Sequence, residues 1–204
     1  MSFIETIAKS EAEGSVRELY DAAEEKLGYI PNYLKLFSYR PEVYKAWQSL
    51  GAAIRDNMTL RRYELVTLAS ARKLGGTYCM LAHGQTMLKS GELDASQLAA
   101  VVRNDAESPL TAEEIEVMRL AEKVVEHAAS ITQADVDRLK GFGMTDAEIL
   151  DIALAAAARC FFSKTLDSLN SEPDAIYLDL GRDLSSVLSV GRAFNEGGAS
   201  ASSA

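Results

Sequence analysis

A cysteine and a histidine one helical turn apart are the residues of this chain whose types and spacing best suit chemistry. Cys79 precedes His83 by four positions, so on a helix both side chains share one face. Gly75 and Gly76 place Cys79 in the first turn of that helix, where the dipole and free N–H groups stabilise a thiolate. A neighbouring histidine can take the thiol proton. The spacing indicates nucleophilic chemistry, and two ordinary core residues are the alternative interpretation.

Glu64, on the preceding predicted helix, is the third candidate. That helix begins near Thr59, so Glu64 lies too deep to act as a cap, and the rest of its face is apolar. A carboxylate on an apolar face is costly unless it is paired. One interpretation is structural, in which Glu64 lies at a solvated edge or forms a salt bridge with Arg61 or Arg72. The other is a buried acid of raised pKa that moves a proton through His83.

Helices are the elements expected to position these residues. Strand-like alternation is almost absent, whereas helix-start signals recur. Thr111 with Glu114, and Thr145 with Glu148, match capping boxes. The sequence therefore predicts an all-α fold. The predicted helices cover about residues 14–27, 41–55, 59–74, 78–90, 94–103, 111–129, 132–140, 145–170 and part of 174–190.

Length and composition predict one globular domain. The 204 residues, 48% hydrophobic and 25% charged, suffice for a sizeable core. We expect a single helical domain over residues 1–194. The small, polar segment 195–204 is predicted to be a disordered tail. No signal peptide and no run of about 18 apolar residues is present, so we expect a cytoplasmic protein that does not cross a membrane.

Charge and residue types exclude several function classes. A net charge of −9 without a basic stripe argues against nucleic-acid partners, whose phosphates require clustered positive charge. Two cysteines without an export signal indicate reduced thiols. With two histidines and no ligand cluster, no metal site is expected. No phosphate-binding loop or serine-nucleophile elbow occurs, and no cofactor is expected.

The positions of Glu64, Gly76, Cys79 and His83 relative to one another resemble the signature of the alkylhydroperoxidase D and carboxymuconolactone decarboxylase superfamily. Its peroxidase branch carries Glu, eleven residues, Cys, two residues, Cys, three residues and His. Glu64, Cys79 and His83 match these spacings, and Tyr78 matches the tyrosine before the second cysteine, but Gly76 replaces the first cysteine. The core likeness covers about residues 41–100. It implies an alkylhydroperoxidase D-like helical fold.

The resemblance implies a thiol-dependent peroxidase. Cys79 would attack a peroxide and become a sulfenic acid, His83 would be its proton partner, Glu64 would orient His83, and Tyr78 would add a hydrogen bond. Because the resolving cysteine is missing at Gly76, an external thiol or redox protein would complete the cycle. Members of the family commonly form dimers, trimers or hexamers, so a homo-oligomer is expected.

A faint internal repeat makes a second cysteine, Cys160, a candidate site residue. Glu148 is followed by small residues and an aromatic residue at the same offsets as Glu64, which predicts a weak duplication of a helical unit. Cys160 then occupies the position of Gly76 in the second unit. It is either a resolving thiol for Cys79 or a small buried hydrophobic residue.

Two other functions remain open. In a decarboxylase-like enzyme, the Glu64–His83 pair would move protons on a small organic acid, and Cys79 would only pack. Alternatively, the loss of the first cysteine at Gly76 is typical of a degenerate site, and the protein would be a helical redox-sensing or binding oligomer.

Overall fold

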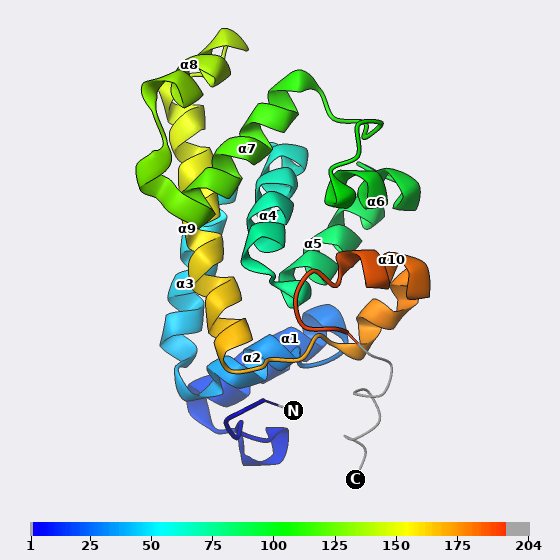
Figure 1. Ribbon diagram of the computed structural model, residues 1–204. Coiled ribbons are helices and arrows are strands. Elements are labelled where there is room, and N and C mark those ends of the chain that lie inside the picture. Colours follow the sequence, from blue (N-terminus) through cyan, green and yellow to red (C-terminus); the bar gives the residue numbers. More distant parts are fainter. Residues whose placement is uncertain (1, 195–204) are drawn as a thin grey trace.

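The chain folds into a set of packed α-helices joined by short connections (Figure 1). The computed structural model describes residues 2–194, in which no β-strand occurs, and this confirms the all-α prediction. The predicted tail, 195–204, lies outside the described residues. The α-helices are α1 (Gly14–Leu27), α2 (Asn32–Leu36), α3 (Pro41–Arg55), α4 (Leu60–Leu74), α5 (Thr77–Lys89), α6 (Ala95–Arg103), α7 (Ala112–His127), α8 (Gln133–Gly141), α9 (Asp146–Ser168) and α10 (Arg182–Leu188).

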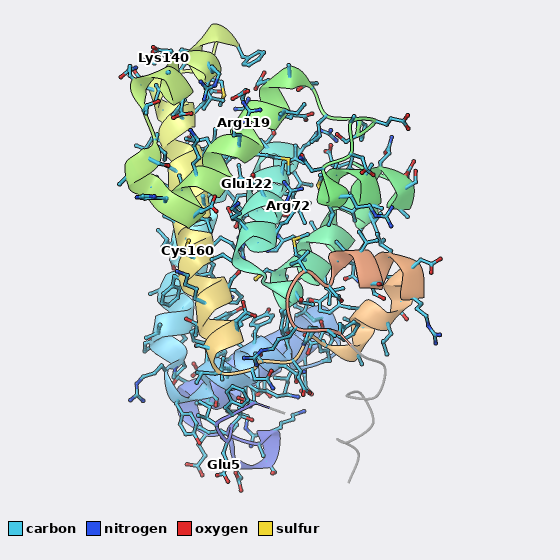
Figure 2. All side chains as sticks on the ribbon, in the orientation of Figure 1. Glu5, Arg72, Arg119, Glu122, Lys140 and Cys160 are labelled. Carbon is cyan, nitrogen blue, oxygen red and sulfur yellow. The ribbon has the colours of Figure 1, made fainter. Side chains whose placement is uncertain are left out.

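Helix α4 lies in the middle of the molecule. It packs against α5, α7 and α9, which surround it in Figure 1. Every residue from Tyr63 to Ala71 is buried, as expected for a helix covered on several sides. Arginines at its two ends pair with glutamates of α7: Arg61 with Glu114, and Arg72 with Glu122. Figure 2 labels Arg72 and Glu122 between the two helices.

Local signals explain where the helices begin. The capping boxes of α7 and α9 form as predicted, with Thr111 and Thr145 each accepting a hydrogen bond from the backbone N–H three residues on. A further capping box at the start of α6, between Asp94 and Gln97, is not among the predicted ones. These caps satisfy N–H groups that would otherwise lack partners.

The turn between α4 and α5 is built from two glycines. Gly75 ends α4 with φ at 70°, a left-handed conformation that favours glycine. Gly76 follows as the N-cap of α5. The chain therefore reverses within two residues, and this places the first turns of α5 beside α4.

Two elements differ from the sequence prediction. The helix expected within 174–190 is divided into a 3₁₀ helix, Ala175–Leu180, and α10, because Gly181 adopts φ 77° between them. The second copy of the repeat lies in one continuous helix, α9, whereas the first copy breaks at Gly75. The duplication itself stays a prediction. No helix in residues 2–194 is long and apolar enough to cross a bilayer.

Candidate active site

Glu64 and His83 meet between α4 and α5. The Nδ1 atom of His83 lies 2.6 Å from Oε2 of Glu64. Arg61 and Arg72, the alternative partners for Glu64, bind Glu114 and Glu122 instead. In the neutral imidazole, Nδ1–H donates to the carboxylate, and Nε2 keeps its lone pair. The pair can therefore present a basic nitrogen at the site.

The surroundings of His83 favour its neutral form. Burial lowers the pKa of His83 below its ordinary value, and the positive charges of Arg159 and Arg55 add to this effect, while Glu64 opposes it. The His83 side chain keeps 19% of its surface exposed, against 5% for Glu64. His83 is thus the member of the pair through which the site meets solvent.

Cys79 is the third residue of α5 and is only 2% exposed. Two groups of α9 approach its sulfur. Ser163 Oγ lies 2.9 Å from Sγ and donates a hydrogen bond, and Nη1 of Arg159 lies 3.7 Å away. Among the described residues these are the hydrogen-bond partners of Sγ, and His83 is not one of them. The proton-partner role of His83 stays a prediction.

Arg159 brings a buried cation to this thiol. Its side chain is 4% exposed, and its Nη2 donates to the hydroxyl of Tyr63 at 3.4 Å. The guanidinium lies 5.9 Å from the ring centre of Trp47 and 5.8 Å from that of Phe162. Burial acts to lower the pKa of Arg159, but Cys79 and Tyr63 outweigh it and the pKa is raised. The guanidinium is therefore charged.

Neither Arg159 nor Ser163 is among the residues that the sequence patterns single out. A signal does exist, because Arg159 interrupts an alanine-rich, apolar helix, where a charged side chain is costly without a partner. Ser163 follows one turn later on the same face. The partner, Cys79, is eighty residues away in the sequence, and no local pattern indicates that contact.

Tyr78 lies in a separate hydrogen-bonded cluster beside the thiol. Its hydroxyl donates to the carboxylate of Asp174 and accepts the backbone N–H of Tyr33 at 3.4 Å. Asp174 also accepts the backbone N–H of Asn32 at 2.8 Å. Tyr78 therefore ties the start of α5 to α2 and to the segment before the 3₁₀ helix Ala175–Leu180.

Two positions bear on a resolving thiol: Gly76, which replaces the first cysteine of the motif, and Cys160, its counterpart in the predicted repeat. A Cβ atom on Gly76 would lie 3.3 Å from Ser163 Oγ, so the glycine lets α9 approach the start of α5 closely. Cys160 is half-buried on α9 (Figure 2), and both cysteines are free thiols. Burial raises the pKa of Cys160, which disfavours its thiolate. Its resolving role stays a prediction.

Other parts of the described chain offer no competing centre of this kind. Residues 2–194 contain no group of three or more His, Cys, Asp or Glu placed to hold a metal ion. Two surface hollows lie elsewhere, one beside α6 and the loop at 105–109, the other between α7 and α8. Neither is lined by the residues around Cys79.

The described residues form an all-helical fold with a thiol and an imidazole on α5 and a carboxylate on α4, and part of the chain matches a known family. Residues 41–123 match the carboxymuconolactone decarboxylase family. This match covers the part of the chain that carries the sequence motif, and it confirms the predicted resemblance to the alkylhydroperoxidase D and carboxymuconolactone decarboxylase superfamily. Among curated proteins, none matches this chain significantly.

Solved structures of other proteins share this fold. An alkylhydroperoxidase D core protein of Ralstonia eutropha JMP134, described as peroxidase-related, has a TM-score of 0.76 at 20% identity over 86% of this chain and 94% of its own. A peroxidase-related protein of Silicibacter sp. TM1040 has a TM-score of 0.71 at 22% identity, over 86% and 90%. The debrominase Bmp8, in a complex with 2,3,4-tribromopyrrole, has a TM-score of 0.70 at 15% identity, over 88% and 95%. At these identities the likeness establishes the fold.

Proposed function

We propose that this protein is a thiol-dependent peroxidase in which Cys79 reduces a hydroperoxide. The observation that carries the proposal is the environment of the Cys79 sulfur, Sγ. It accepts a hydrogen bond from Ser163, contacts a buried cation at 3.7 Å, and lies in the first turn of α5. Each of these features stabilises a thiolate, the form of cysteine that attacks peroxides.

The Glu64–His83 pair supplies the proton transfer in this reaction. The Cys79 thiolate attacks the terminal oxygen of R–O–O–H, so an S–O bond forms while the O–O bond breaks. Nε2 of His83 accepts the proton of the attacked oxygen and passes it to the departing oxygen. The products are R–OH and a Cys79 sulfenate. Glu64, 2.6 Å from Nδ1, holds the ring and stabilises the transient imidazolium.

An external thiol completes the cycle, because Gly76 stands where the peroxidase branch has its first cysteine. The protonated sulfenate reacts with one thiol, which gives a mixed disulfide and water. A second thiol then releases the Cys79 thiolate as the disulfide of the external thiol forms. Overall, one hydroperoxide and two thiols give one alcohol, one disulfide and one water.

A proton-transfer enzyme of the decarboxylase type is the second candidate. The observation that favours it is that the Glu64–His83 pair is complete without Cys79, because Nδ1 of His83 contacts the buried Glu64 carboxylate and Nε2 is left as the basic nitrogen. Such a pair can move a proton on a small organic acid. In this case Cys79 and its α9 partners would serve packing alone, and the reaction would survive replacement of the thiol.

The test compares single cysteine variants. Cys79→Ser is expected to abolish oxidation of a small dithiol by hydrogen peroxide and by an organic hydroperoxide, whereas the matched Cys160→Ser variant keeps it. Mass spectrometry of the Cys160→Ser protein after peroxide treatment should find one added oxygen, or a thiol adduct, on Cys79. Equal turnover by Cys79→Ser and wild type would refute the peroxidase. Turnover of a small lactone acid by both would establish the second candidate.

A further inference from the structure

Arg159 poses a physical problem that the peroxidase proposal does not address. Its guanidinium is buried, and Glu64, the carboxylate that acts on it through its charge, is itself paired with His83. A buried charge without a direct partner is expensive, so such groups are normally paired. Its hydrogen bonds go to Tyr63, a neutral hydroxyl, and to Cys79. Of these two partners, the thiol is the one that ionises more easily.

The donors around the sulfur indicate its charge. A guanidinium has five N–H donors and no acceptor, so the sulfur must be the acceptor in its contact with Arg159. The hydroxyl of Ser163 reaches the same sulfur at 2.9 Å. Two donors from consecutive turns of α9 therefore converge on one atom. A thiolate accepts such hydrogen bonds far better than a neutral thiol does.

The other titratable groups near the thiol are engaged elsewhere. On α4, Glu64 also acts on Arg159 through its charge, but its carboxylate is hydrogen bonded to His83. On α3, Arg55 lies over the ring of Tyr63, with its charge 5.8 Å from the ring centre.

On the side of the C-terminal segment, Tyr177 is kept neutral because burial raises its pKa. On α9, Asp167 is partly buried, burial raises its pKa, and it lies near the position of a Gly76 Cβ. None of these groups replaces Cys79 as the direct partner of Arg159.

We propose that Cys79 rests as a thiolate whose counter-ion is Arg159, with Ser163 as the second donor. The inference rests on Cys79 being the reactive thiol of the proposed function, and it assigns the activation of that thiol to α9 instead of to His83. His83 then stays neutral and free to move the peroxide proton. The activating charge comes from a residue outside the Glu–Cys–His motif.

One feature of Arg159 fits a site that makes an oxygen anion. Its Nε–H is a buried donor with no acceptor in the described residues. An unpaired buried donor is costly in the resting protein, but it is useful if an anionic oxygen forms nearby. The sulfenate oxygen made on Cys79 is such an acceptor.

The experiment measures the thiolate directly in a Cys160→Ser background, where Cys79 is the remaining thiol. Arg159→Met removes the charge at similar length, Arg159→Lys keeps it, and Arg103→Met removes an exposed charge on α6 as the matched control. At about pH 6, the Arg159→Met variant should lose the ultraviolet absorbance of the thiolate. Its Cys79 should also be alkylated at least ~10-fold more slowly, because a cation within contact distance changes the ionisation of a thiol by that factor or more. Arg159→Lys should recover most of the rate, and Arg103→Met should match the parent.

A second measurement separates electrostatics from misfolding. At about pH 10, where an ordinary thiol is ionised, the alkylation rates of all folded variants should converge. Failure to converge would mean that Arg159 acts through packing, and this overturns the inference. Loss of the thiolate in His83→Asn but not in Arg159→Met would also overturn it.

The outcomes keep the two proposals distinct. An unchanged thiolate in Arg159→Met, together with peroxide turnover by the parent, would refute the counter-ion and leave the peroxidase standing. A thiolate that depends on Arg159, in a parent protein that does not turn over peroxide, would support the counter-ion and refute the peroxidase.

Discussion

At the scale of single residues, the site combines three ionisable side chains that are rarely found inside a protein. Glu64, His83 and Arg159 come from α4, α5 and α9, and Arg159 contacts the thiol of Cys79, which is almost inaccessible. Their charges are coupled, since Glu64 raises the pKa of His83 while Arg159 lowers it. The protonation state of His83 is therefore set by its neighbours, and it can be measured.

The titration of His83 provides a prediction. Because the folded-state pKa of His83 is lowered, its imidazole should titrate below about 6.5. Glu64→Gln removes a negative charge that supports the imidazolium, so the midpoint should fall further. Peroxide turnover should fall by about 10- to 100-fold without unfolding, as expected when a proton-transfer group loses its partner.

Proton NMR of the imidazole signals measures this effect, and the chain has only two histidines. His127→Gln assigns the signals, because His127 is exposed and distant in sequence. An upward shift of the His83 midpoint in Glu64→Gln would show that the two side chains do not interact as described.

At the scale of elements, the start of α5 is held from two directions. Ser163 and Arg159 of α9 contact its thiol, and Tyr78 binds Asp174, which precedes the 3₁₀ helix Ala175–Leu180. Asp174 is buried, and burial raises its pKa, although Tyr78 and the backbone N–H of Asn32 act against this effect. The carboxylate thus joins α5, α2 and the C-terminal segment.

Asp174→Asn tests this connection through its pH dependence. A raised folded-state pKa means that the native state binds its proton more tightly than the unfolded state. The stability that Asp174 contributes is then present below about pH 4 and lost as the pH rises through its folded-state pKa. At about pH 4 the substitution should cost about 1 kcal/mol through weakened hydrogen bonds. This cost should shrink, or change sign, as the pH rises.

Urea unfolding at several pH values measures the difference in free energy of unfolding between the two proteins. Asp183→Asn, on α10, is a control with the same charge change at an exposed position. A cost for Asp174→Asn that increases with pH would mean that the carboxylate is stabilised in its charged form.

At the scale of the whole molecule, α3 and α9 lie side by side (Figure 1) and expose apolar side chains. On α9, Leu150, Leu154, Ala157 and Phe161 are exposed at spacings of four, three and four residues, so they form one stripe. Such a stripe on one helix can pack against the same stripe of a second copy related by a two-fold axis.

We therefore expect a homo-oligomer that uses this face. Leu154→Glu should shift the sedimentation of the protein toward the 22.1 kDa monomer, because it buries a charge in an apolar interface. Leu27→Glu is the matched control, since Leu27 on α1 is 44% exposed against 42% for Leu154. If both variants sediment like the wild type, the stripe is not an interface.

The sequence by itself determined most of the helices and the residues of the motif, although it did not indicate the division of the helix predicted within 174–190. Capping boxes and glycine stops act over three or four residues, so the bounds of α7 and α9 and the break after α4 follow from local chemistry. The spacing of Cys79 and His83 likewise places both on α5. The pairing of Glu64 with His83 was one of two interpretations, because an acid on an apolar face indicates that a partner exists and does not identify it.

Only the tertiary structure decided what touches the thiol. Arg159 and Ser163 reach Cys79 across eighty and eighty-four residues of sequence. That contact depends on how α9 packs against α4 and α5, and on Gly76, whose missing side chain leaves room for Ser163. Helical periodicity gives the face on which a side chain lies, but it carries no information about which distant helix covers that face. The contact between the buried cation of Arg159 and the Cys79 thiol is therefore a property of the tertiary structure and not of any local sequence pattern.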